Sequence, residues 1–290
     1  MSLNVKSKEK KEAFFLILPS LLGMGVFFVL PFIWMLKLSF SQLTSTGEKF
    51  GVGNYVQLYS NSSFRLAAAN TTKFTIISVV LIMGISLFIA LMLNKNLPMK
   101  RQLRTAFIVP LVVPVASIIL FFEMIFDGSG LINAIASRIG IEGVNWLSSD
   151  KTMIVVVVIY VWKNVGYNII LFWAGLQNIP IEYYEAASID GANSFQQFSF
   201  ITLIYLMPTT FFVFVISIMN SFKVFREVYI LAGAYPHQSV YMLQHFMNNQ
   251  FSKLDYYKLV SAAILMMIVV TVIVFMMFIV QKKISKAIGE

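Results

Sequence analysis

A lysine stands near the middle of a long apolar run, where a charge is costly unless it has a partner or a function. Lys163 lies within the run 152–176 and is followed by Asn164, Tyr167 and Asn168. At the centre of a membrane helix, a lysine costs about 2.5–3.5 kcal/mol of insertion free energy, so it must face a wet cavity or a partner. These four residues are candidate solute-binding groups. The alternative is a hydrogen-bond network that only holds helices together.

A second polar group lies at the end of another apolar run. Ser217, Asn220 and Ser221 follow the spacing i, i+3, i+4, which places them on one helix face, and Lys223 and Arg226 come next. We predict that Ser217, Asn220, Ser221 and Lys223 also face a solute. For Lys223 and Arg226, the alternative is a pair of cations whose stems snorkel to the membrane interface.

The composition indicates a protein whose solvent is largely lipid. Of its 290 residues, 58% are hydrophobic and 12% are charged, and the mean hydropathy is +0.79. The net charge of +9 lies in short clusters beside apolar runs, which favours an anionic membrane surface over nucleic acid as the partner. Without cysteine, a phosphate-binding loop, or the motifs of zinc and serine hydrolases, we expect no catalytic residue, no metal site and no cofactor bound by this chain.

Six segments are long and apolar enough to cross a bilayer, which takes about 20 residues. They are 13–38, 70–93, 105–126, 152–176, 200–222 and 260–281. We therefore predict an all-α integral membrane protein with six transmembrane helices. Prolines are expected to interrupt the first and third helices, at Pro19, Pro31, Pro110 and Pro114. The first segment follows lysines, as a signal peptide does, but it is too long and has no cleavage site.

Basic residues indicate which loops are cytoplasmic. They gather in the N-terminal tail, after the second span and in the C-terminal tail: Lys6, Lys8, Lys10, Lys11, Lys95, Lys100, Arg101, Arg104, Lys282, Lys283 and Lys286. By the positive-inside rule, both termini lie in the cytoplasm and the loops 41–69, 127–151 and 223–259 face out.

The loop after the fourth span is an exception to this rule. No Lys or Arg occurs between Lys163 and Lys223, and the loop carries Glu182, Glu185 and Asp190 instead. Either the neighbouring loops already determine the topology, or a basic protein surface covers this loop.

Within this loop, Pro180 is suited to a helix start, and the dipole favours Glu182 in the first turn. Ala186 and Ala187 are helix formers small enough to let another surface approach closely, and Gly191 is placed to end the helix. A second short helix, 194–200, is expected to lead into the fifth span.

This loop resembles the Glu-Ala-Ala signature of binding-protein-dependent ABC importer permeases. The family pattern E-A-A-x-x-D-G-A is met by residues 185–192, and Ile201, Leu203 and Pro208 follow it, while Ile204 stands where the family usually has proline. The stretches 162–167, 174–180 and 222–225 resemble the sugar-importer branch, nearest to the maltose F subunit. Ala234-Tyr235-Pro236 stands where that branch often has Gly-Gly-Pro.

The resemblance implies a type I importer permease core whose acidic loop is a cytoplasmic coupling helix. Its contacts to an ATPase would come from Glu182, Glu185, Ala186, Ala187, Asp190 and Gly191. The implied partners are a second homologous permease subunit, two ATPase subunits that bind ATP and magnesium, and an extracytoplasmic solute-binding protein. The implied solute is a carbohydrate, and the implied location is the bacterial inner membrane.

The domain organisation that follows is a cytoplasmic tail (1–12), a first span with its external loop (13–69), a permease domain (70–281) with the coupling loop 178–200, and a second tail (282–290). Two alternatives stay open. One is an ABC permease for a charged solute, such as glycerol phosphate or an acidic sugar, bound by the cations named above. The other is a secondary transporter driven by an ion gradient, which predicts inverted repeats and broken helices.

Overall fold

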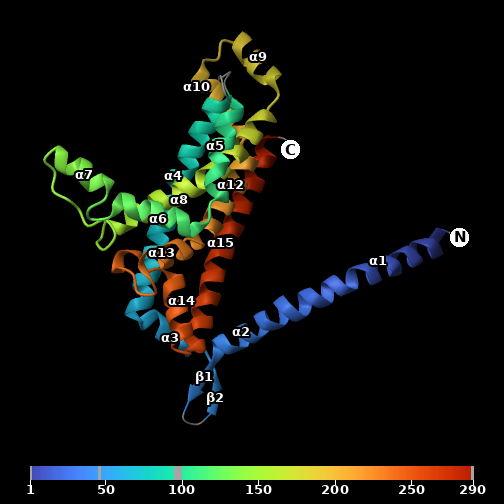
Figure 1. The fold of residues 1–290 in the computed structure, drawn as a ribbon. Helices are drawn as coiled ribbons and strands as arrows, with labels where there is room; N and C mark the ends of the chain where they lie inside the picture. The colour runs from blue at the N-terminus through green and yellow to red at the C-terminus, as the bar shows by residue number, and fades with distance from the viewer. Residues whose placement is uncertain (1, 45–46, 95–99, 289–290) are drawn as a thin grey trace. The chain divides into compact units, whose positions relative to one another are not determined.

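The computed structural model describes residues 2–44, 47–94 and 100–288, and the chain falls into two compact units (Figure 1). One unit comprises Met1–Asn61 with Gln250–Ile268, and the other comprises Ser62–Asn249 with Val269–Glu290. Of the basic residues expected to mark the cytoplasmic face, Lys95 lies outside the described residues. No side chain is described for Lys6, Lys8, Lys10, Lys11, Lys100, Arg101, Arg104 and Lys286.

The first unit holds the N-terminal helices, a small hairpin and the beginning of the last helix. Its elements are α1 (Ser2–Met24), the π-helix η1 (Gly25–Val29), α2 (Leu30–Phe40), β1 (Ser41–Thr44), β2 (Gly47–Phe50), α3 (Gly53–Ser60) and the first turns of α15 (Tyr256–Ile288). Ser39 joins them, because its carbonyl accepts from Asn54 Nδ2 at 3.0 Å and from Ser261 Oγ at 3.3 Å. The two-stranded hairpin is the one element of this unit that the all-helical prediction did not contain.

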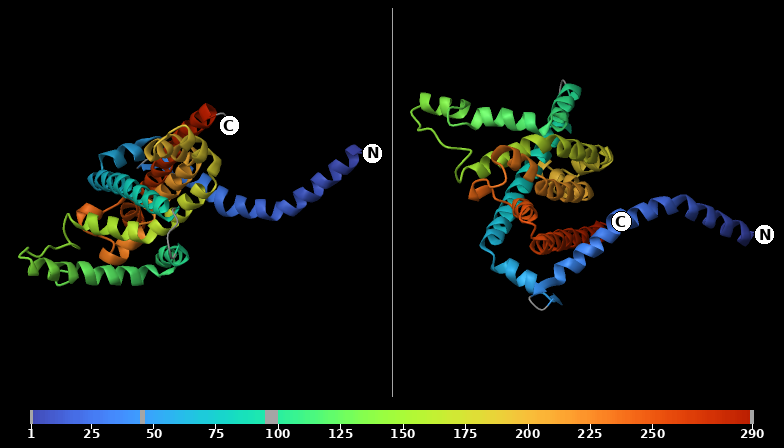
Figure 2. Two further views of the ribbon diagram at one scale, coloured as in Figure 1. Left: turned by 90° about the horizontal axis from the view of Figure 1, so that it is seen from above. Right: turned by 60° about the horizontal axis from the view of Figure 1, so that its bottom comes forward.

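The second unit is a helical bundle whose elements differ greatly in length. They are α4 (Ser62–Asn94), α5 (Lys100–Val112), α6 (Val115–Phe126), α7 (Leu131–Arg138), α8 (Thr152–Gln177), α9 (Ile181–Ile189), α10 (Ser194–Gln197), the π-helix η2 (Phe198–Thr202), α11 (Leu203–Tyr205), α12 (Met207–Phe222), α13 (Phe225–Ala232), η3 (Gln238–Val240) and α14 (Leu243–Ser252). Figure 2 shows α4, α8 and α12 packed together in two further views.

Small side chains on α4 allow α8 to pack closely against it. Ser78, Ser86 and Ala90 recur at helical spacing and are fully buried, interleaved with Phe74 and Ile82. Because lipid tails are as apolar as leucine, helices in a membrane associate through such close packing and not through a hydrophobic driving force. This face therefore makes the centre of the bundle.

Gly166 of α8 fits against the backbone of α5. A Cβ built on Gly166 would lie 1.7 Å from the carbonyl oxygen of Phe107. No side chain can occupy that space, so glycine is what allows α5 and α8 to touch here.

The prediction of six membrane-spanning helices is confirmed. Helices long and apolar enough to span a bilayer cover Ala13–Phe40, Ser62–Asn94, Val115–Arg138, Thr152–Gln177, Met207–Ala232 and Tyr256–Lys283 of the described chain. The second begins eight residues before the predicted start at 70, because its polar first turns remain helical beyond the apolar run.

The proline predictions were correct only in part. Pro19 lies inside the continuous helix α1, and Pro110 inside α5, so neither interrupts its helix. The third span is broken at Pro114, whose extended ψ of 138° separates α5 from α6. A proline disfavours helical backbone at the residue before it, which explains the break after Val112. Pro31 follows the π-helical turn η1, where the regular ladder is interrupted.

The fifth span starts later and ends later than the predicted range 200–222. Its helix breaks at Leu206, and Pro208 stands at the start of α12. After Phe222, the chain makes one turn and continues as α13 until Gly233, whose φ of 72° ends the helix. The segment 225–232, predicted as part of an external loop, therefore belongs to the span.

Candidate functional site

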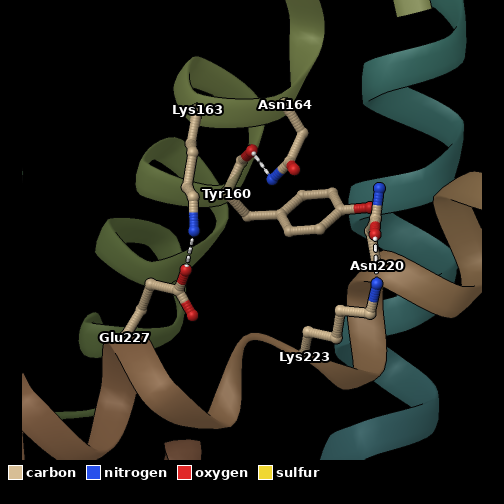
Figure 3. A network of polar contacts seen from close by, with 6 residues as sticks. All are labelled: Tyr160, Lys163, Asn164, Asn220, Lys223 and Glu227. Atoms are coloured by element: carbon tan, nitrogen blue, oxygen red, sulfur yellow. Dashed lines mark hydrogen bonds and ion pairs between the residues drawn. The ribbon is translucent and has the colours of Figure 1, made fainter. Parts of the chain in front are cut away.

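Lys163 is paired with an acid inside the membrane-spanning region. Its ammonium forms an ion pair with Glu227 Oε1, and the two side chains are 13% and 7% exposed. Figure 3 shows the lysine extending from α8 towards Glu227 on α13. A lysine in the middle of a span was expected to need a partner, and that partner lies within this chain. The other carboxylate oxygen, Oε2, is buried and has no hydrogen-bond partner among the described residues.

Two more of the predicted residues on α8 face other helices or their own backbone. Asn168 is 1% exposed, and its Nδ2 donates to Ser217 Oγ at 2.8 Å. Asn164 Nδ2 donates to the carbonyl of Tyr160, and the Tyr160 hydroxyl donates to the carbonyl of Ser217 at 2.7 Å. These bonds fasten α8 to α12 in the way that an interhelical network does.

The predicted solute-facing residues of α12 do not all have the same environment in the structure. Ser221 is buried, and its hydroxyl shares a 3.0 Å hydrogen bond with Thr75 of α4. Asn220 is only partly buried, and its Oδ1 accepts from the exposed Lys223 at 3.2 Å. Tyr167, which is 38% exposed, also remains accessible. Apart from the paired Lys163, the members of the predicted set that are not buried, and can still reach a solute, are thus Asn164, Tyr167, Asn220 and Lys223.

Glu227 was not among the predicted site residues, because it was assigned to an external loop. A signal for it existed, since a lysine placed centrally in a span calls for a counter-charge, and Glu227 follows the fifth apolar run closely.

The acidic loop is built as its residues predict. α9 begins after Pro180, which is its N-cap and not its first residue, and Glu182 lies in the first turn. The helix ends in a Schellman motif: Gly191 has φ 82°, its N–H donates to Ser188 O at 3.1 Å, and Ala192 N–H donates to Ala187 O at 2.8 Å. The predicted glycine stop is confirmed.

A second cap starts the short helix α10. Asn193 accepts from Gln196 N–H at 2.9 Å, and Gln196 Oε1 accepts from Asn193 N–H at 2.8 Å, which forms a capping box. The loop therefore has a defined fold of its own.

The loop presents both charge and apolar surface. Glu182, Glu185, Ala186 and Asp190 are exposed, while Ala187 is partly covered. Large apolar groups beside them are uncovered as well, with Ile189 86% and Phe195 75% exposed. In Figure 1, α9 and α10 lie beyond one end of the bundle. Such an end is suited to contact with another protein.

Three predicted cytoplasmic segments share that end of the second unit. Gln177, at the end of α8, donates to Asn94 Oδ1 at the end of α4, so these two helix ends lie side by side. The C-terminal end of α15 lies there too (Figure 1). This agrees with the alternation of spans from which the orientation was predicted.

A separate cavity of about 790 Å³ lies between the end of α6, the loop 143–148 and the residues after α13. Its lining includes Glu123, Asp127, Asn133 and Tyr235, and none of the predicted solute-binding residues. No group of three or more His, Asp or Glu residues able to hold a metal occurs in the described part of the chain.

Comparison with known proteins identifies the family of this chain. Residues 82–286 match the family described as binding-protein-dependent transport system inner membrane component. The chain belongs to this family. It is a multi-pass membrane protein and a transport subunit, as predicted.

Individual relatives and solved structures agree with this family assignment. It is 35% identical over 218 residues to the arabinooligosaccharides transport system permease protein AraP of Bacillus subtilis (strain 168), covering 73% of this chain and 69% of that one. It is 32% identical to the trehalose/maltose transport system permease protein MalF of Thermococcus litoralis, covering 87% of each. A chain of a bacterial ABC transporter that imports the acidic polysaccharide alginate has the same fold, with a TM-score of 0.83 at 21% identity over 98% of this chain and 99% of that one. The type I importer permease fold is thereby confirmed.

Proposed function

We propose that the permease forms half of the translocation pore of an ATP-driven carbohydrate importer and is coupled to a separate ATPase through α9. The observation that carries this proposal is the exposed helix α9, closed by a Schellman motif, that bears Glu182 and Glu185 at one end of the bundle. Its small Ala186 allows close approach, and its carboxylates call for a basic surface opposite. This also explains why the loop carries no positive charge.

The rest of the assembly follows from the family. A second homologous permease subunit completes the pore, two ATPase subunits bind ATP and magnesium, and an extracytoplasmic protein delivers the solute. The basic tails and the basic loop after the second span support a cytoplasmic position for the termini and α9, in a protein of the bacterial inner membrane. The permease itself needs no cofactor for this role.

A carbohydrate is the solute that the relatives and the polar groups support together. AraP is named for arabinooligosaccharides and MalF for trehalose and maltose. In this chain, Glu227 forms an ion pair with Lys163, the lysine near the middle of the fourth span. Asn220 supplies an amide that can hydrogen-bond to sugar hydroxyls, and Tyr167 supplies an aromatic face on which a sugar ring can stack. Binding a neutral sugar in this way needs no charged side chain.

One observation supports a charged solute as the second candidate. Lys223 and Arg226 are both exposed, and neither has an acidic partner among the described residues. An acidic sugar or glycerol phosphate would use these cations directly. The alternative of an ion-driven secondary transporter has no support from the family.

The coupling role is tested by reversing one charge. In the complex reconstituted with its ATPase, partner permease and binding protein, we expect Glu185→Lys to abolish stimulation of ATP hydrolysis by the solute-loaded binding protein. Glu142→Lys makes the same charge change at an exposed site outside the loop and should keep the stimulation. Normal stimulation in Glu185→Lys would refute the coupling assignment.

The solute is tested with the same assay. Neutral pentose and hexose oligosaccharides are compared with uronic acid oligomers and glycerol phosphate for stimulation of ATP hydrolysis. Stimulation by the acidic compounds alone, lost in Lys223→Gln, would replace the carbohydrate proposal with the second candidate.

A further inference from the structure

The coupling loop is attached to the fifth span by side chains as well as by the backbone. Tyr183 of α9 stacks on Tyr205 of α11, with ring centroids 4.9 Å apart and an interplanar angle of 21°. The next residue, Tyr184, shares a 2.9 Å hydrogen bond between its hydroxyl and that of Thr202 in η2. Two adjacent residues of α9 thus contact two residues, three positions apart, in the segment that leads into the fifth span.

A third contact closes the loop on itself. Gln197 Nε2 donates to Ser188 Oγ at 2.9 Å and to the carbonyl of Ala192 at 3.3 Å. It joins the end of α9 to the end of α10 across the turn at Gly191. Within the segment 181–205, noncovalent side-chain contacts therefore hold both ends of α9.

The backbone alone would transmit force poorly between α9 and the fifth span. The connection runs through Gly191, which has a left-handed φ of 82° and no neighbour within 4 Å of the position of a Cβ. A glycine turn with open space around it can bend under load. The side-chain contacts bypass that turn.

We propose that Tyr183, Tyr184, Thr202 and Tyr205, the tyrosine clamp, transmit movement of the coupling helix to the fifth span. The inference rests on the proposed coupling role of α9 and assigns positioning residues for it. Thr202 is 5% exposed and lies in the π-helical turn η2, so the clamp holds the segment before the fifth span at a buried residue. Immediately beyond, Leu206 is fully buried, and a Cβ built on Gly175 of α8 would lie 2.9 Å from its Cδ1. The gripped segment is therefore seated directly on the fourth span.

Graded substitutions test the clamp. Tyr205→Ala removes the stack and Tyr184→Phe removes only the hydroxyl, while Tyr205→Phe keeps a stacking ring. We expect Tyr205→Ala to lower binding-protein-stimulated ATP hydrolysis by up to about tenfold, the range that one aromatic stack can account for. Tyr184→Phe should lower it less, and Tyr205→Phe should keep it. Phe211→Ala removes a ring from another interhelical aromatic pair, Phe211–Phe278, and is the matched control.

A cross-linking rescue separates transmission from stability. The chain has no cysteine, so Tyr183→Cys with Tyr205→Cys creates the only thiol pair. Under reducing conditions, this double variant should bind its ATPase subunits but respond poorly to the loaded binding protein. A short bifunctional thiol reagent should restore the response. A merely unstable protein would not be rescued this way.

The outcomes distinguish this inference from the proposed function. If the reduced double variant and Tyr205→Ala respond like the wild-type complex while Glu185→Lys does not, the clamp is refuted and the coupling role stands. If Glu185→Lys also responds normally, the coupling role itself fails. Loss of response in the clamp variants that the cross-link does not restore would also overturn the inference.

Discussion

Removing one member of the Lys163–Glu227 pair should destabilise the permease far more than removing both. Both side chains are at least 87% covered, since they are 13% and 7% exposed, and one carboxylate oxygen already lacks a partner. Breaking such a buried pair costs about 3–5 kcal/mol, because one charge is left without compensation. That corresponds to roughly a hundred- to a few thousand-fold in the ratio of folded to unfolded protein.

Replacing both partners by apolar side chains of similar volume should be nearly neutral or stabilising by about 1–4 kcal/mol. The variants are Lys163→Met, Glu227→Leu and the double variant, and the free energy of unfolding of the full-length chain is measured by titration with SDS. We expect each single variant to lose about 3–5 kcal/mol and the double variant to recover nearly all of it. If the double variant loses the sum of the two single losses, the pair is not coupled and the reasoning is wrong.

The same double variant tells whether Lys163 contacts the solute. With stability restored, a lysine that only positions α13 can be replaced without loss of transport. A stable double variant that assembles but does not transport would instead return Lys163 to the solute-binding set.

Two further predictions concern packing and pH. Gly166→Ala should destabilise the chain by about 1–3 kcal/mol or more, because the new Cβ clashes with the Phe107 carbonyl. Gly84→Ala is the control, since the position of its Cβ is open space. Equal thermal midpoints for the two variants would contradict this prediction. Burial lowers the pKa of His245 to about 4, and its Nδ1 accepts from Met242 N–H, so the neutral form is the folded one. Because the unfolded histidine binds a proton near pH 6.5, stability should decline as the pH falls below 6.5 and the loss should be complete near 4; an unchanged pH slope in His245→Gln would refute this.

Local signals were sufficient to predict the fold of the acidic loop from the sequence. Its start, its acidic first turn and its glycine stop depend on residues within one or two turns of each other, so Pro180, Glu182 and Gly191 could be interpreted without the rest of the fold. The Schellman motif and the capping box then add contacts of the same short range.

The ends of the fifth span could not be predicted in the same way. Counting apolar residues ended the span at Phe222, because Lys223 and Arg226 interrupt the apolar run. In the structure the helix resumes at Phe225, since Glu227 is neutralised by a residue 64 positions away in the sequence. A long-range ion pair changes the cost of burying a charge, and a count of apolar residues does not include that change.

Some predicted solute-binding residues are buried between helices and others are accessible, and this difference also depends on long-range packing. Helical spacing places Ser217 and Ser221 on one face, but it does not say whether that face points to a pore or to a neighbouring helix. Their bonds to Asn168 and Thr75 show that it points to α8 and α4. Asn220 lies beside this face and remains accessible. Only the packing of three helices decides between these positions.

These contacts connect the coupling helix to the accessible polar residues through α8 and α12. The tyrosine clamp holds α9 to η2 and α11, Leu206 packs on Gly175 of α8, and bonds to Ser217 fasten α12 to α8 farther along. Ser217 lies 11 residues after Leu206 on the same helical segment, which separates the two attachments by about 16 Å. Helices fixed to each other at two points move together, so α9, α8 and α12 should shift as one body, and α4 should move with them because it packs on α8 and Thr75 bonds to Ser221. Asn220, at the far end of α12, would then be displaced whenever the ATPase displaces Glu185. A substitution at Asn220 that alters solute affinity should therefore also change the ATP concentration needed for transport, and an effect on solute affinity alone would show that α12 bends instead of moving as a unit.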